Sequence, residues 1–177
     1  MNEERICELS YAVEDNVKFV KSVSDKIVAS KAAELDNIIS EIKTNVIDVP
    51  NIDDAAIEHY MMQLVYVLYT INAQVDNFSF YDSISAARTT LAYNEKYAES
   101  QVQAASANKK LTKDDHQQYA ENNTIDEKML NLIYSKSVKI LKGKIDGGYE
   151  TLDVLKRILK HHEQEAFYDK QNRKLLT

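Results

Sequence analysis

The chain has 177 residues, a formal net charge of −6, and 44% apolar residues. This length indicates one domain over residues 1–177. Three glycines and one proline exclude the many tight turns of an all-β fold. We therefore expect an all-α fold of few long helices. A single cysteine, Cys7, permits neither an internal disulfide nor a cysteine-based zinc site, which fits a reducing compartment.

The first residues and the most apolar stretch of the sequence indicate where in the cell the protein is found. The first residues, MNEERICELS, are charged and unlike a secretory or transit peptide. The most apolar stretch, YMMQLVYVLYTI (60–71), is too short to cross a bilayer. We therefore expect a cytoplasmic protein with no membrane partner, in the host cytoplasm if a phage encodes it.

The first long helix is predicted over residues 1–47. Apolar residues from Ile6 to Val46 keep to one helical face, and no glycine or proline interrupts them before Pro50. A helix of about forty residues spans roughly 60 Å. Because a compact domain of this size does not need that length, we expect the helix to pack along a long partner. The partner lies in this chain or in another copy, in an elongated and oligomeric helical bundle.

Central helices are predicted over residues 51–110. Asn51, which acidic residues follow in the sequence, supplies an N-cap. The stretch NFSFYDS (77–83) either bends the helix or splits it in two. Residues 111–123 read as a linker with a short helix, which Thr112 and Asp115 cap. Thr124 and Glu127 then start the last helix, over residues 124–171.

The last helix carries an apolar stripe that alternates steps of four and three. Its members are Tyr134, Val138, Leu141, Ile145, Gly148, Leu152, Leu155 and Leu159. Because the register continues beyond Gly147 and Gly148, we expect one continuous helix in which Gly148 lets another backbone approach. Both a packed kink and a hinge fit this glycine pair. We assign the stripe to packing between copies in an oligomer.

Signals for catalysis or metal binding are nearly absent. The sequence contains no phosphate-binding loop, nucleophile elbow or zincin motif. His161, His162 and Glu165 are close in sequence, but they lack the paired Glu-x-x-His pattern of carboxylate di-metal bundles. We expect no enzyme, cofactor or metal site, and a metal-dependent bundle enzyme is a distant alternative.

Cations and tyrosines raise the question of an anionic ligand. Residues 136–177 hold ten Lys or Arg against six Asp or Glu, which favours an anionic ligand or head-to-tail contact between copies. Lys136 and Lys139 point away from the apolar stripe, and either a solvated face or an anion-binding face fits them. Tyr93, near Arg88 and Lys96, fits a stacking platform for single-stranded nucleic acid. The alternative is a tyrosine packed between helices.

The order of segments in the second half resembles the UvsY-type recombination mediators of large tailed phages. These segments are ARTTLAYNEKY (87–97), NKKLTKDD (108–115), TIDEKMLNLIYSKSVKILKGKI (124–145) and LDVLKRIL (152–159). The resemblance implies a non-enzymatic helical protein that assembles into a ring and binds single-stranded DNA. It also implies contacts with a RecA-like recombinase and a single-strand binding protein, which the recombinase replaces.

The resemblance also implies a DNA contact at a Lys-x-Arg sequence before a leucine and aromatics. Arg88 matches this arginine, whereas Ala86 replaces the lysine. Because that lysine is missing, we expect lysines later in the sequence to make more of the DNA contact. The nucleic-acid-binding residues that we expect are Arg88, Tyr93, Lys96, Lys109, Lys110, Lys113, Lys136 and Lys139. The alternative is a helical structural or adaptor protein of phage assembly that binds no nucleic acid.

Overall fold

The structure is a computed structural model that describes residues 3–49 and 52–175, with side chains for residues 13–49, 52–168 and 171. Helices make up 92% of this part, and no strand occurs in it. The all-α prediction is therefore confirmed. The side chains of Ile6 and Cys7, and all of Pro50 and Asn51, lie outside the described residues.

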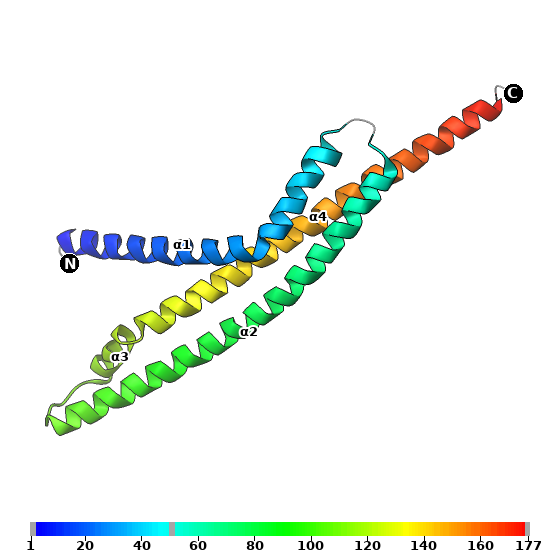
Figure 1. The fold of residues 1–177 in the computed structure, drawn as a ribbon. Helices are drawn as coiled ribbons and strands as arrows, with labels where there is room; N and C mark the ends of the chain where they lie inside the picture. The colour runs from blue at the N-terminus through cyan, green and yellow to red at the C-terminus, as the bar shows by residue number, and fades with distance from the viewer. Residues whose placement is uncertain (1–2, 50–51, 176–177) are drawn as a thin grey trace. The chain divides into compact units, whose positions relative to one another are not determined.

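Four α-helices and one short π-helix follow one another along the chain (Figure 1). They are α1 (Glu3–Ile42), η1 (Lys43–Ile47), α2 (Asp54–Ser106), α3 (Lys113–Asn122) and α4 (Ile125–Leu175). Together α1 and η1 match the helix expected over residues 1–47. Helix α2 runs through residues 77–83 without a break, so this stretch does not split it.

The chain divides into two compact units. Unit 1 consists of residues 1–28 and 76–139, and unit 2 of residues 29–75 and 140–177. Each of α1, α2 and α4 contributes a segment to both units.

Unit 1 is held together by polar contacts between helices and by an aromatic cluster. Ser24 on α1 donates a hydrogen bond to the carbonyl oxygen of Ile133 on α4 (3.3 Å). Thr89 on α2 donates to the carbonyl oxygen of Glu127 on α4 (3.1 Å). The ring of Tyr134 lies 6.0 Å from the ring of Tyr81 on α2, nearly parallel to it. Helix α4 therefore packs against both α1 and α2 within this unit.

Unit 2 packs segments of α1, α2 and α4 around an apolar core. Its fully buried side chains include Leu35, Ile42, Ile57, Leu64, Leu68, Leu141 and Leu155. Polar contacts join α4 to the other two helices at three levels. Lys144 pairs with Asp36 (2.5 Å), Tyr149 accepts a hydrogen bond from Asn72 (3.2 Å), and His162 contacts Asp54 (2.7 Å). As α4 advances, its partners on α2 move back toward Asp54, so these two helices are antiparallel.

The glycine pair lies inside α4, which continues through it as predicted. A Cβ atom on Gly148 would meet the side chains of Leu68 and Leu35. These leucine side chains, rather than the backbone that we expected, fill the space beside Gly148. Nothing comes within 4 Å of such an atom on Gly147. The two glycines therefore have different surroundings.

The stripe assigned to packing between copies is used inside the chain. Val138, Leu141, Ile145, Leu152 and Leu155 are buried in the single chain, as is Gly148. Tyr134 and Leu159 are half-buried. Because intrachain packing already covers these residues, a folded second copy cannot reach most of them.

Candidate functional site

All eight residues expected to bind nucleic acid fall in unit 1. Six of them are exposed cations: Arg88, Lys109, Lys110, Lys113, Lys136 and Lys139. Within the described residues, no carboxylate lies within 4.0 Å of their charged groups. These six side chains are therefore free to meet an anion.

Three of these lysines surround the turn between α2 and α3. Helix α2 ends in a Schellman arrangement, in which Lys109 N–H donates to Ala104 O (2.9 Å) and Asn108 N–H donates to Ala105 O (3.2 Å). Asn108 takes the left-handed conformation that this cap requires (φ 52°), and asparagine tolerates that conformation better than most residues. Lys109 and Lys110 follow directly, and Lys113 begins α3.

A capping box fixes the other side of this turn. The backbone N–H of Asp115 donates to the Thr112 hydroxyl (3.2 Å), and the backbone N–H of Thr112 donates to the Asp115 carboxylate (2.8 Å). The Thr112 backbone bond, and then its hydroxyl, lower the pKa of Asp115. The box confirms the cap predicted at Thr112. It also holds the neighbouring lysines on an ordered turn.

Lys96 differs from the other cations because it has an internal partner. Its ammonium group lies 2.8 Å from Glu99, which also accepts hydrogen bonds from Gln103 (2.9 Å) and Tyr119 (3.3 Å). The hydrogen bond to Glu99 and the charge of Glu99 raise the pKa of Lys96. A phosphate would therefore compete with this carboxylate for the ammonium group of Lys96.

Tyr93 is also partly occupied by packing. It is half-buried and stacks on Tyr97, with 6.4 Å between ring centres and 23° between planes. Tyr97 in turn meets His116 of α3 edge-on at 5.8 Å, and His116 Nδ1 lies 2.8 Å from the Ser100 hydroxyl. One face of Tyr93 is thus covered. Tyr93 and Tyr97 therefore take part in packing within unit 1.

Unit 2 presents a surface that we did not expect from the sequence. Met62, Val65, Tyr66 and Tyr69 on α2 are 75%, 50%, 66% and 77% exposed. Their spacing places them on one face of the helix. The same helix buries Leu64 and Leu68, so α2 is apolar on two faces. Large contiguous exposed apolar patches are a common feature of interaction sites, so this face is a candidate for one.

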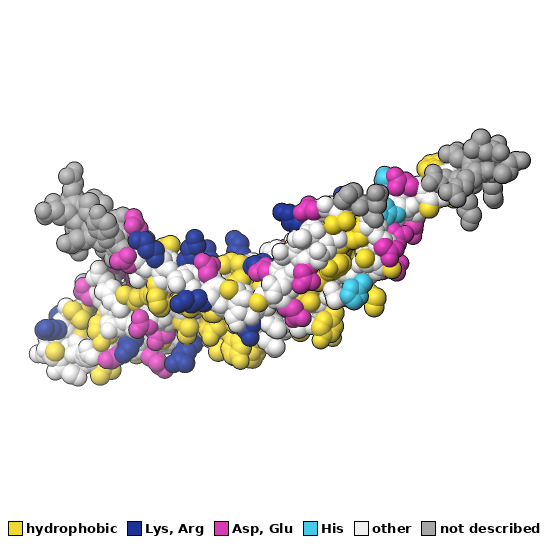
Figure 2. Space-filling model, turned by 45° about the horizontal axis from the view of Figure 1, so that its top comes forward, with side chains coloured by type: hydrophobic (Ala, Val, Ile, Leu, Met, Phe, Trp, Pro, Cys, Tyr) yellow, Lys and Arg dark blue, Asp and Glu magenta, His cyan; other side chains and the backbone are white. Residues whose placement is uncertain are grey.

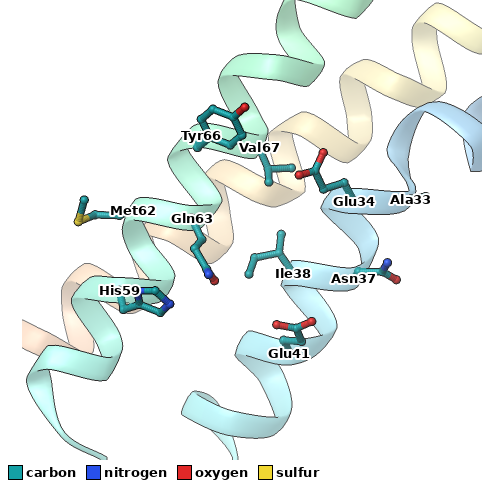
Figure 3. A pocket seen from close by; sticks show the side chains of 10 residues that line it. All are labelled: Ala33, Glu34, Asn37, Ile38, Glu41, His59, Met62, Gln63, Tyr66 and Val67. Atoms are coloured by element: carbon teal, nitrogen blue, oxygen red, sulfur yellow. The ribbon is translucent and has the colours of Figure 1, made fainter.

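A groove of about 830 Å³ lies beside this exposed apolar face of α2, between α1 and α2. In Figure 3, Ile38 of α1 and Gln63 of α2 reach toward each other across it. The nearly buried side chains of Ile38 and Val67 form its apolar base. Glu34 and Glu41 lie on its α1 side, and Met62 and Tyr66 on its α2 side. Figure 2 likewise shows apolar side chains reaching the surface between charged ones.

The histidines do not form a common site. His161 lies 3.6 Å from Glu165 on the surface of α4, whereas His162 contacts Asp54 at the start of α2. No group of three potential metal ligands occurs among the described residues. Within the same residues, no helix combines the length and apolar character needed to cross a bilayer.

Comparisons with known protein families, curated proteins and solved structures find no match to this chain. Two surfaces remain as candidates for function. One is the set of exposed cations in unit 1, and the other is the apolar groove in unit 2.

Proposed function

We propose that this chain is a non-enzymatic recombination mediator that binds single-stranded DNA. In this role it helps a RecA-like recombinase to replace a single-strand binding protein. The supporting observation is the set of six exposed cations in unit 1, none of which lies within 4.0 Å of a carboxylate among the described residues. The resemblance of residues 80–170 to UvsY-type mediators points to the same function.

The chemistry of these cations suits a phosphate backbone rather than a particular base sequence. Lys109, Lys110 and Lys113 offer three positive charges around one capped turn, and lysine binds phosphate as a point charge. Because the whole chain has a net charge of −6, one copy would bind weakly. Several copies on one strand would add their contacts and offset this weakness.

The proposal is tested by fluorescence anisotropy with a labelled single-stranded oligonucleotide over a range of salt concentrations. The logarithm of the affinity should fall linearly with the logarithm of salt concentration. The slope of this line should be about −0.7 for each phosphate contact. Replacing Lys109, Lys110 and Lys113 with alanine should reduce this slope. The matched control replaces three exposed cations of unit 2, which are Lys142, Arg157 and Lys160. Absence of binding at low salt by the folded protein would contradict the proposal.

The second candidate function is a self-associating structural or adaptor protein of phage assembly that binds no nucleic acid. The exposed apolar face of α2 favours it, because this face has no partner within the described part of unit 2. Both candidates include a homo-oligomer. Strong self-association without any binding of DNA would select the second.

A further inference from the structure

We propose that α2 of one copy pairs with α2 of a second copy, antiparallel and side by side, through an exposed seam in unit 1. The seam consists of Phe80, Ile84, Ala87, Leu91, Asn94 and Ala98. It is distinct from the exposed apolar face of α2 in unit 2. The pairing rests on the self-association that both candidate functions include, and it does not require DNA binding.

The seam lies on the side of α2 that the rest of unit 1 leaves uncovered. Its three large apolar side chains are, in chain order, 65%, 48% and 59% exposed, and its other three residues are exposed as well. At about 100° per residue, Ser85, Thr89 and Ser100 lie on the opposite side of the helix. Ser85 and Ser100 are buried, and Thr89 donates to Glu127 O of α4 (3.1 Å). Packing within the chain thus uses one side of α2, and the seam occupies the other.

The spacing of the seam indicates that its partner is another helix. Successive members are four, three, four, three and four residues apart, which is the alternation by which helices pack side by side in a coiled coil. Helix α2 is continuous over this segment, which is green in Figure 1. From Phe80 to Ala98 the seam is roughly 27 Å long. A partner helix can contact it over this whole length.

The sizes of the seam residues are complementary when two copies run antiparallel and cross at the level of Thr89. Residues equally far before and after Thr89 then lie opposite each other. The three kinds of layer that result between the copies are Phe80 with Ala98, Ile84 with Asn94, and Leu91 with Ala87. Each layer combines a large side chain with a smaller one, as close packing requires. A parallel pair in register would instead place large residues on large ones and alanine on alanine.

The charges on and beside the seam also suit a second copy. The chain has a net charge of −6, so two copies repel each other on approach. The seam contains no charged residue. The positions that flank it are Tyr81, Ser83, Arg88, Thr90, Glu95 and Tyr97. Their one cation and one anion lie on the same flank, so the surface that meets the second copy is neutral overall.

The size of the seam predicts a weak dimer. The seam and its flanks comprise twelve residues, roughly half of the about 20–30 residues that each partner contributes to a standard interface. A standard interface buries about 800 Å² per partner, so each copy should bury roughly 400 Å² here. Interfaces of this size occur in transient complexes. We therefore expect a two-fold symmetric dimer that dissociates on dilution.

The first test measures the mass of the full chain by sedimentation over a wide range of protein concentrations. The unchanged protein should pass from monomer to dimer as its concentration rises. Leu91→Glu places a charge in two layers of the pair and should raise the dissociation constant at least about thirtyfold, as loss of a central contact does. Leu132→Glu is the matched control, because Leu132 is a 49% exposed leucine of unit 1 that lies on α4. It should dimerise like the unchanged protein.

The second test reports the direction of the two helices. In a protein whose one cysteine is removed by Cys7→Ser, Gln101→Cys provides a single exposed position on α2 for a nitroxide label. Because Gln101 follows Thr89 by twelve residues, two labels in the antiparallel pair should lie roughly 36 Å apart along the helix axis. In a parallel pair in register they would lie about 10 Å apart, the separation of packed helices. Pulsed electron paramagnetic resonance distinguishes the two distances.

Three outcomes would overturn the inference. The first is an unchanged protein that stays monomeric up to its solubility limit, and the second is unimpaired dimerisation of Leu91→Glu. The third is a separation of about 10 Å between the labels. Circular dichroism checks that Leu91→Glu is folded; should it lose its helical signal, Ile84→Gln, at another exposed position of the seam, decides instead. Binding of DNA is measured separately, so its failure would leave the result on the dimer intact.

Discussion

Gly148 on α4 faces Leu68 on α2 so closely that a Cβ atom on the glycine would stand 2.6 Å from Leu68 Cδ2. The same atom would stand 3.3 Å from Leu35 Cδ1. Both leucines are fully buried, so neither can move aside without disturbing the core of unit 2. The missing side chain at residue 148 thus sets how closely α4 approaches its neighbours.

Alanine substitutions at the two adjacent glycines should have opposite effects on stability. Gly147→Ala should raise the free energy of unfolding by about 1 kcal/mol, because alanine is the better helix former and the site has room. Gly148→Ala should lower it by roughly 1–3 kcal/mol, the usual effect of overpacking a core. Urea denaturation followed by circular dichroism measures both. Equal stabilisation by the two substitutions would show that Leu68 does not confine Gly148.

The buried stripe of α4 should support the folded chain itself. Leu141→Ala should lower the free energy of unfolding by about 2–5 kcal/mol, because Leu141 is fully buried. Ile140→Ala, on the neighbouring residue, which is 36% exposed, is the matched control and should have a smaller effect. Thermal and urea denaturation at low protein concentration check this. If Leu141→Ala dissociated oligomers and left stability unchanged, the stripe would belong to an interface instead.

Lys96 should contribute little to DNA affinity while Glu99 holds it. Lys96→Ala should change the affinity for single-stranded DNA less than Arg88→Ala does, because Arg88 is exposed and has no ion pair with a described residue, whereas Lys96 pairs with Glu99. Glu99→Gln should strengthen binding, since it removes a negative charge and frees the ammonium group. Anisotropy at fixed low salt compares the three variants. A larger loss for Lys96→Ala than for Arg88→Ala would restore Lys96 as a DNA contact.

The capping box of α3 should make this helix sensitive to acid. The folded-state pKa of Asp115 lies below its ordinary value of 3.8. Its contribution to stability is therefore complete above that value and is lost as pH falls through the lowered pKa. Asp115→Asn should flatten the dependence of melting temperature on pH below about 4. Asp114→Asn, one residue away and outside the box, should leave that dependence unchanged.

Thr112 gives an independent check on the same cap. Thr112→Ala removes the hydroxyl that accepts from the backbone of Asp115 and should lower the free energy of unfolding by about 1 kcal/mol at neutral pH. Thr112→Ser keeps the acceptor and should cost far less. Chemical denaturation of the two variants makes the comparison. Equal losses would point to the methyl group rather than to the cap.

Local signals in the sequence located the helices well. Few glycines, one proline and the capping signal at Thr112 indicated long helices and the short α3, and the apolar register predicted an unbroken α4 at Gly148. At the second expected cap, the Thr124 hydroxyl instead donates a hydrogen bond back to Ala120 O (2.9 Å). Which side chains face that glycine was not predictable, because Leu35 and Leu68 come from segments about eighty to more than one hundred residues away. The pairing of Lys96 with Glu99 was within reach, since residues three apart are neighbours on a helix.

The apolar groove was harder to foresee for a physical reason. Met62, Tyr66 and Tyr69 alternate on α2 with the buried Leu64 and Leu68. Two apolar faces on one helix blur the periodicity from which a single face is recognised. Only the packing of the chain reveals which face is covered. The stripe on α4 is ambiguous in sequence, because intrachain packing and packing between copies use the same pattern.

The contacts of α1 set an order of events during synthesis. Ser24 bonds to Ile133, 109 residues later, and Asp36 pairs with Lys144, 108 residues later. At about 5–20 residues per second, the ribosome needs roughly 5–20 s to make those partners. Over that interval the apolar side of α1 has no α4 to cover it. During this interval α1 is a suitable substrate for a chaperone that binds nascent helices.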